Sequence, residues 1–123
     1  MPRILLVDDD EPLRTLLRLV LVHMGYEVVE ASNGKEAVKL LQPAPPDLVL
    51  TDIVMPEQEG LETITVVRRL HPAMKIIAMS GCGRIKAIDY LKIAKMMGAD
   101  RVLAKPFSNA ELTLALDELL GAG

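Results

Sequence analysis

The chain has 123 residues, which suffices for one domain with one hydrophobic core and is too short for two. Half of the residues are hydrophobic and 25% are charged, a balance that is typical of an ordered globular protein and argues against a disordered one. The formal net charge of -3 provides no basic surface of the kind that nucleic-acid binding requires, so we expect no direct contact with DNA or RNA.

Short apolar runs rich in β-branched residues alternate along the chain with longer segments of helical periodicity. Residues 4–7 predict the first strand. Residues 12–24 carry apolar side chains at three- and four-residue spacing, which predicts an amphipathic helix that Gly25 ends. A second strand is predicted over residues 27–31. Residues 33–41 predict a second helix, which Asn33 would cap.

The second helix must end before the prolines at 43, 45 and 46, because proline lacks the amide donor that a helix needs. The remaining segments predict strands over residues 47–52, 75–80 and 102–104 and helices over residues 61–70, 87–97 and 109–120. Five strand and helix pairs in strict alternation predict an α/β fold. We expect a single doubly wound parallel sheet of five strands, with five helices on its two faces.

Polar residues stand at the ends of four of the predicted strands. Asp8 and Asp9 follow the first strand, Asp52 ends the third, Ser80 ends the fourth and Lys105 follows the fifth. In a sheet of this class, ligands bind outside the carboxyl ends of the strands. We therefore expect three carboxylates, one hydroxyl and one ammonium group to converge at one edge of the sheet.

Charge repulsion indicates what such a site would bind. Two carboxylates about 4 Å apart repel by roughly 4 kcal/mol at an effective dielectric constant near 20. Lys105 alone cannot balance three acids, whereas a hard divalent cation can, and Mg²⁺ suits a set of carboxylates that also meets phosphate oxygens. Ser80 and Lys105 would then contact a phosphoryl group. Asp52 could act as the nucleophile that forms an aspartyl phosphate.

Four segments of the chain resemble, in order, the receiver domain of two-component response regulators. They are ILLVDDDEPLR at residues 4–14, DLVLTDIVMP at 47–56, IIAMSG at 76–81 and the segment from Gly98 to Phe107 that contains KPF. The resemblance covers nearly the whole chain. It implies a flavodoxin-like (βα)5 fold with strand order 2-1-3-4-5, and one receiver domain over residues 1–123.

The resemblance also implies a phosphorylation site. Asp52 matches the residue that a histidine kinase or phosphotransfer protein phosphorylates. Asp8 and Asp9 match the acids that bind Mg²⁺ together with Asp52, and Val54 matches the position whose backbone carbonyl also binds the metal. Because the side chain of Val54 cannot orient an attacking water, we expect slow hydrolysis of the phosphorylated form.

Lys105 matches the lysine that contacts the phosphoryl group, and in the family its bond to Pro106 is usually cis. Ser80 matches the switch hydroxyl. Its usual aromatic partner is absent, because Val102 stands at that position and has no ring to swing. The interval from Ser80 to Lys105 is longer than in common relatives, with the surplus in residues 81–86, so we expect readout through that loop and the following helix.

Simpler interpretations exist for these residues. Asp8, Asp9 and Asp10 could be a helix-capping cluster, since acids favour helix N-termini, and Lys105 could be a solvated surface lysine. The loop at residues 81–83 only partly matches a dinucleotide fingerprint, so no nucleotide cofactor is expected.

Two other functions share the same nucleophile. One is an aspartyl-phosphate phosphatase or phosphotransferase, which generally needs an acid two positions after the nucleophile, where Val54 stands. The other is a degenerate receiver that acts by binding alone. We expect a signalling domain without turnover of external substrates, which controls a downstream effector or a fused output domain. A second copy of the chain is a further partner that we consider, in a homodimer.

The single cysteine, Cys82, excludes an internal disulfide bond, and two histidines without a second cysteine make no zinc ligand set. The apolar stretch at residues 4–7 is too short for a secretory signal, and no stretch is long enough to span a bilayer. These observations predict a cytoplasmic protein without a membrane partner.

Overall fold

The computed structural model describes residues 1–42, 44–53, 59–80 and 92–121 of the chain. The strands are β1 (Arg3–Val7), β2 (Glu27–Ala31), β3 (Leu48–Asp52), β4 (Lys75–Ser80) and β5 (Arg101–Ala104). The helices are α1 (Glu11–His23), α2 (Gly34–Lys39), α3 (Glu59–Leu70) and α5 (Asn109–Leu120). Residues 92–97 are helical as well, whereas the predicted start of that helix and the loop at 81–86 lie outside the described residues.

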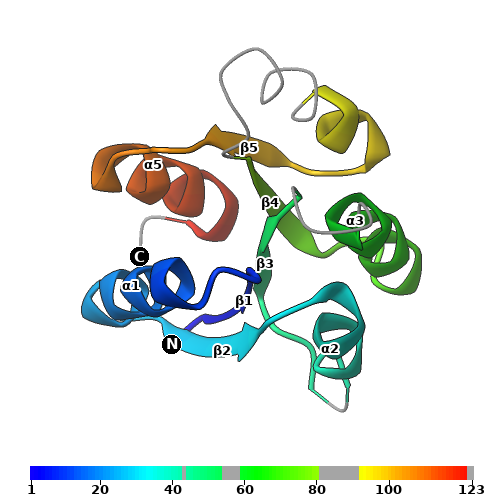
Figure 1. Ribbon diagram of the computed structural model, residues 1–123, viewed down its shortest axis with the longest axis horizontal. Helices are drawn as coiled ribbons and strands as arrows, with labels where there is room; N and C mark the ends of the chain where they lie inside the picture. The colour runs from blue at the N-terminus through cyan, green and yellow to red at the C-terminus, as the bar shows by residue number, and fades with distance from the viewer. Residues whose placement is uncertain (43, 54–58, 81–91, 122–123) are drawn as a thin grey trace.

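The five strands form one parallel sheet in the order β2-β1-β3-β4-β5. This order confirms the predicted doubly wound topology. Figure 1 shows α1 and α5 on one face of the sheet and α2, α3 and the helical residues 92–97 on the other. The three inner strands, β1, β3 and β4, are covered on both faces, which is why each contains a continuous run of buried apolar residues.

The alternation of side chains along each strand divides the core into two layers. In β1, Ile4 and Leu6 pack with α1 and α5, whereas Leu5 and Val7 pack with α2 and α3. The helices contribute their apolar stripes to these layers: Leu17, Leu21, Leu112 and Leu116 on one face, and Ala37, Leu41, Ile64 and Val67 on the other. Both layers bury apolar side chains against one rigid sheet, whose carboxyl edge then carries the polar residues.

Capping side chains determine where the helices begin. Asp10 accepts a hydrogen bond from the backbone amide of Leu13 at 3.2 Å, so α1 begins at Glu11, one residue earlier than predicted. Asn33 caps α2 as predicted, by accepting from the amide of Glu36 at 2.8 Å. Within the part of the chain that the structure describes, no helix has the length and apolar character needed to cross a membrane.

Candidate functional site

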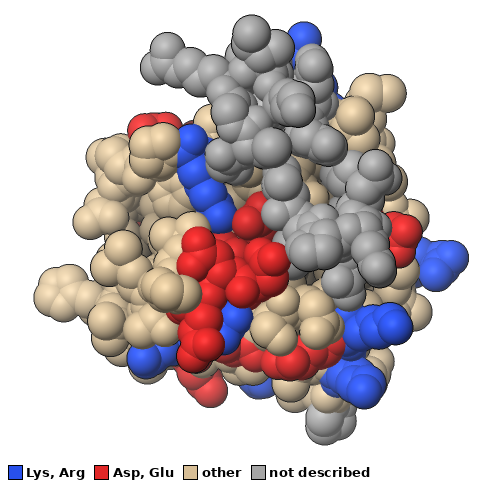
Figure 2. Space-filling view, viewed as in Figure 1, with Lys and Arg blue, Asp and Glu red and all other residues tan. Residues whose placement is uncertain are grey.

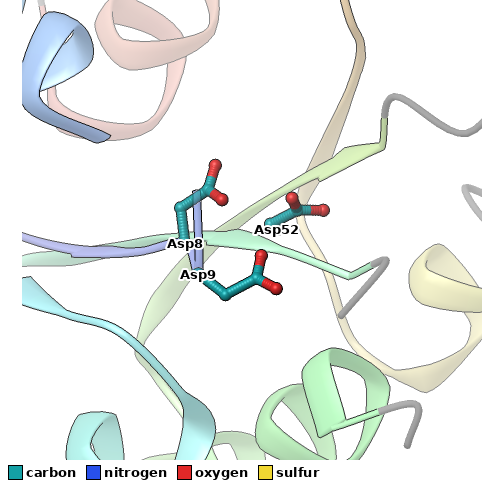
Figure 3. Close-up of side chains that lie close together, drawn as sticks. All are labelled: Asp8, Asp9 and Asp52. Carbon is teal, nitrogen blue, oxygen red and sulfur yellow. The ribbon is translucent and has the colours of Figure 1, made fainter. Parts of the chain in front are cut away.

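Three carboxylates meet at the carboxyl edge of the sheet. Asp8 and Asp9 directly follow β1, and Asp52 is the last residue of β3, the parallel neighbour of β1. One carboxylate oxygen from each lies within 4.8 Å of the others. Figure 3 shows the three side chains gathered beyond the strand ends, and Figure 2 shows an acidic patch on this face of the molecule. The structure therefore brings together the three acids that the sequence placed at strand ends.

Lys105 joins two of these acids. Its Nζ donates to Oδ2 of Asp8 at 3.0 Å and to Oδ2 of Asp52 at 2.9 Å. Its backbone amide donates to the carbonyl of Ser80 at 2.8 Å, which ties the lysine to the end of β4. The Lys105–Pro106 peptide bond is cis, in agreement with the resemblance described above. Lys105 is thus part of the site and is not a solvated surface lysine.

The environment of Lys105 favours its charged form. Burial lowers the pKa of its ammonium group, but the hydrogen bond and negative charge of Asp52, followed by those of Asp8, outweigh burial and leave the pKa raised. Both of these carboxylates are buried, whereas Asp9 is exposed. One ammonium group faces three acids, so the cluster keeps an excess of negative charge.

Ser80 lies at the same edge, on β4 between β3 and β5. It is the strand residue paired with Ala104, which immediately precedes Lys105. The residue is fully buried, and its Oγ makes no hydrogen bond with any residue that the structure describes. Leaving a buried hydroxyl without a hydrogen-bond partner is energetically costly. With respect to the described residues, Ser80 therefore has an unused hydrogen-bond donor at this edge of the sheet.

Two other residues were predicted for the site, Val102 and Val54. Val102 is half-buried in β5 and packs against the core layer that includes Ala78, its partner on β4. Val54 lies outside the described residues. The arrangement around Val102 is that of a core residue, in keeping with its aliphatic side chain.

The sequence did not reveal two further features of the site. One is Arg14 of α1, whose Nη1 donates to the backbone carbonyl of Asp8 at 2.6 Å. Its signal in the sequence was its place at the end of the segment at residues 4–14, which assigns it no role.

The second feature is a groove of about 870 Å³ that begins at the acidic site and runs along α1. Asp9, Asp52 and Lys105 line one end of this groove. The rest of its lining is mainly apolar, from Leu13, Leu16, Leu17, Val20, Pro106 and Phe107.

Comparisons with known proteins agree with this geometry. The sequence profile of the response regulator receiver domain matches residues 4–117. The chemotaxis protein CheY of Thermotoga maritima is 36% identical over 119 residues, which cover 95% of this chain and 96% of that protein. The transcriptional regulatory protein PhoP of Bacillus subtilis, which regulates alkaline phosphatase synthesis, is 33% identical over 96% of this chain, but the match covers only 48% of PhoP.

Solved structures show the same fold. The receiver domain of NtrX from Brucella abortus superimposes with a TM-score of 0.88 at 28% identity, covering 98% of this chain and 99% of that one. The response regulator TrrA from Thermotoga maritima, solved in complex with Mg²⁺ and BeF, gives a TM-score of 0.84 at 35% identity over 97% and 99% of the two chains. Together with the strand order and the acidic edge of the sheet, these matches show that the chain belongs to the response regulator receiver domain family.

Proposed function

We propose that this receiver domain accepts a phosphoryl group on Asp52 from a histidine kinase or phosphotransfer protein. Asp8, Asp9, Asp52 and the backbone carbonyl of Val54 would bind Mg²⁺. The observation that carries the proposal is the cluster of three carboxylates within 4.8 Å, two of which share the single ammonium group of Lys105. In the transfer, a carboxylate oxygen of Asp52 forms a bond to phosphorus as the bond to the donor's histidine nitrogen breaks.

The donor set fits Mg²⁺ rather than a softer metal. All three side-chain ligands are carboxylates, and no histidine or cysteine joins them among the described residues. Mg²⁺ needs only one or two carboxylates and completes its shell with water and phosphate oxygens. When bound, the ion would supply positive charge that offsets the repulsion among the acids and the incoming phosphoryl group.

Two other side chains would hold the phosphoryl group. Lys105 is placed to exchange part of its contact with Asp52 for a phosphoryl oxygen, because its Nζ already lies 2.9 Å from the Asp52 carboxylate. The buried hydroxyl of Ser80 would donate a hydrogen bond to another oxygen and so gain the partner that it lacks among the described residues. Movement of Ser80 toward the phosphoryl group would begin the switch, which cannot use an aromatic ring at Val102.

The groove along α1 supports a protein as the phosphoryl donor. Its apolar wall continues directly from Asp9, Asp52 and Lys105, so a partner that seats apolar side chains beside α1 would place its phosphohistidine over Asp52. Leu16, in the groove wall, is 58% exposed, so its apolar side chain is accessible to a partner. A small-molecule phosphodonor would need no such surface.

The remaining parts of the proposal concern the chain as a whole. Residues 1–123 would form one cytoplasmic receiver domain that passes its state to a downstream effector or a fused output domain. Turnover of external substrates is not part of this proposal, because Val54 occupies the position at which aspartyl-phosphate phosphatases generally carry an acid.

Incubation with acetyl phosphate and Mg²⁺, followed by intact-mass spectrometry, tests the proposal. The wild-type protein should gain one phosphoryl group, and Asp52→Asn should gain none. Asp47→Asn, at the start of the segment that leads into β3, is the matched control and should be labelled like the wild type. Labelling of Asp52→Asn, or no labelling of the wild type, would overturn the assignment.

A further inference from the structure

We infer that Arg14 is a positioning residue, which aims the carboxylates of Asp8 and Asp9 at the metal by holding the backbone between them. The inference rests on the proposed Mg²⁺ site and adds a residue of α1 to it. Arg14 does not belong to the acidic cluster, and its side chain would not contact the phosphoryl group.

The guanidinium group of Arg14 bridges two strands of the sheet. Its Nη1 donates to the carbonyl of Asp8, after β1, at 2.6 Å, and its Nε donates to Oε1 of Glu30 on β2 at 3.1 Å. The side chain is only 15% exposed, so these charge-assisted hydrogen bonds are largely shielded from water. The planar fork of arginine makes both bonds at once, which an ammonium group on a flexible stem cannot match.

Asp8 is held at each of its polar groups. Its amide donates to the carbonyl of Ala31 at 3.1 Å, its Oδ1 accepts from the amide of Asp10 at 2.9 Å, and its Oδ2 accepts from Lys105. The contact with Arg14 completes this set at the backbone carbonyl. The Asp10 amide and Lys105 therefore hold the carboxylate, while Ala31 and Arg14 hold the backbone from which it projects.

Asp9 depends on the same contact in a less direct way. The carbonyl of Asp8 and the amide and Cα of Asp9 belong to one planar peptide unit, so a hydrogen bond to the carbonyl restrains the plane from which the Asp9 side chain starts. Among the described residues, none holds the exposed carboxylate of Asp9 by a hydrogen bond. Its place in the cluster therefore depends on the conformation of its own backbone, one peptide unit of which Arg14 restrains.

Arg18 provides an internal comparison. It lies one turn further along α1, and its Nε is 3.4 Å from Oε2 of Glu30, the same carboxylate that Arg14 contacts. Its side chain is 38% exposed and makes no hydrogen bond or ion pair with Asp8 among the described residues. The two arginines thus share charge, helix and partner and differ in the bond to Asp8.

Electrostatics and positioning predict opposite effects of removing Arg14. Loss of a positive charge near three carboxylates should by itself strengthen the binding of a cation. Loss of a group that orients the metal ligands should weaken binding, and groups of this kind typically contribute about tenfold to a hundredfold in metal affinity. A rise in the Kd for Mg²⁺ after removal of Arg14 therefore indicates a positioning role, and a fall indicates a purely electrostatic one.

The experiment is a titration of the whole chain with Mg²⁺, measured by isothermal titration calorimetry, for wild type, Arg14→Gln, Arg14→Lys and Arg18→Gln. Arg14→Gln should raise the Kd for Mg²⁺ about tenfold, and Arg18→Gln should leave it within about twofold of wild type. Arg14→Lys should also bind more weakly, since it keeps the charge and loses the fork. Labelling by acetyl phosphate should be slower for Arg14→Gln at low Mg²⁺ and recover at saturating Mg²⁺.

Thermal unfolding followed by circular dichroism establishes that each variant is folded at the titration temperature. If Arg14→Gln is not, Glu30→Leu replaces it, since this change removes the acceptor that holds Nε of Arg14, and it should also raise the Kd. Equal or tighter Mg²⁺ binding by the folded Arg14 variant, or an equal loss in Arg18→Gln, would overturn the inference alone. Failure of the wild type to bind Mg²⁺ would overturn the proposed function and this inference with it.

Discussion

Three consecutive acids at the end of β1 have three different roles. Asp8 is buried and bonded to Lys105, Asp9 is the exposed member of the acidic cluster, and Asp10 caps α1. The backbone turns from strand to helix over these residues, so each side chain leaves it in a different direction. The helix-capping interpretation that the sequence left open is therefore correct for Asp10, whereas Asp8 and Asp9 face the site.

Charge repulsion at the site predicts that Asp9→Asn will stabilise the metal-free protein. The amide keeps the shape of the carboxylate and removes one of three charges that only Lys105 offsets among the described residues. The midpoint of thermal unfolding in EDTA should rise by a few degrees. With saturating Mg²⁺ the difference should shrink or reverse, because the wild type binds the ion more tightly.

Asp10→Asn is the matched control for this prediction. Asparagine caps helices about as well as aspartate, and Asp10 does not belong to the cluster. Its unfolding midpoint in EDTA should stay close to that of the wild type. A lower midpoint for Asp9→Asn in EDTA would mean that the carboxylates are not in repulsive contact in solution.

At the scale of elements, Arg68 connects α3 to the segments that directly precede β4 and β5, at the edge of the sheet opposite the acidic site. Its guanidinium group donates to the carbonyls of Pro72, Met74 and Gly98 and forms an ion pair with Asp100 at 2.9 Å. Gly98 has a φ of +127°, and a Cβ there would lie 3.1 Å from Nε of Arg68. Glycine at this position thus permits both the backbone conformation and the close approach of the arginine.

Arg68→Gln should lower the free energy of unfolding by about 2 kcal/mol, because several carbonyls lose a charged donor at once. Arg69→Gln, the neighbouring exposed residue, should change it by less than about 0.5 kcal/mol. Urea denaturation followed by circular dichroism measures both values. Similar values for the two variants would show that the Arg68 network contributes no stability.

The exposed apolar face of α1 gives a prediction about partner specificity. Leu16→Glu should reduce phosphotransfer from a histidine kinase that labels the wild type by at least about tenfold, because it places a charge in the docking groove. Labelling by acetyl phosphate should not change, since the small donor does not contact this surface. The comparison of the two rates measures docking separately from chemistry.

Leu114→Glu is the control for the docking prediction. Leu114 lies on α5 and is 62% exposed, so it is about as exposed as Leu16. Unlike Leu16, it does not line the groove. Phosphotransfer to this variant should remain at the wild-type rate. Equal losses in both variants, or slower labelling of Leu16→Glu by acetyl phosphate, would contradict docking along α1.

At the scale of the whole molecule, the sheet brings distant parts of the chain to one edge. Lys105 and Asp8 are 97 positions apart and lie within hydrogen-bond distance. Because the site draws on the ends of four strands, β1, β3, β4 and β5, any ligand of the site binds the folded chain and not the unfolded one. Ligand binding should therefore stabilise the whole domain.

Mg²⁺ at a hundredfold excess over its Kd should raise the free energy of unfolding by about 2.7 kcal/mol in a single cooperative transition. Addition of BeF with Mg²⁺ should raise it further in the wild type and not in Asp52→Asn. Scanning calorimetry measures both shifts. Two separate transitions, of which only one responds to Mg²⁺, would contradict a single domain over residues 1–123.

The site could be predicted from the sequence to the extent that it follows from the sheet. Apolar periodicity identified the strands and helices, and the rule for parallel sheets placed Asp8, Asp9, Asp52, Ser80 and Lys105 at one edge. Capping was partly predictable, as at Asn33. These features are local or follow from topology, so residue order alone carries them.

The tertiary structure decided which side chains support that edge. Arg14 contacts Glu30 and the Asp8 carbonyl only because α1 packs beside β1 and β2, and Arg68 reaches Gly98 across 30 positions of sequence. Such contacts depend on helix rotation and on distances between elements, which no local pattern encodes. The sequence by itself determined the fold and the acids at the strand ends, and packing determined which side chains hold those acids and where the groove along α1 lies.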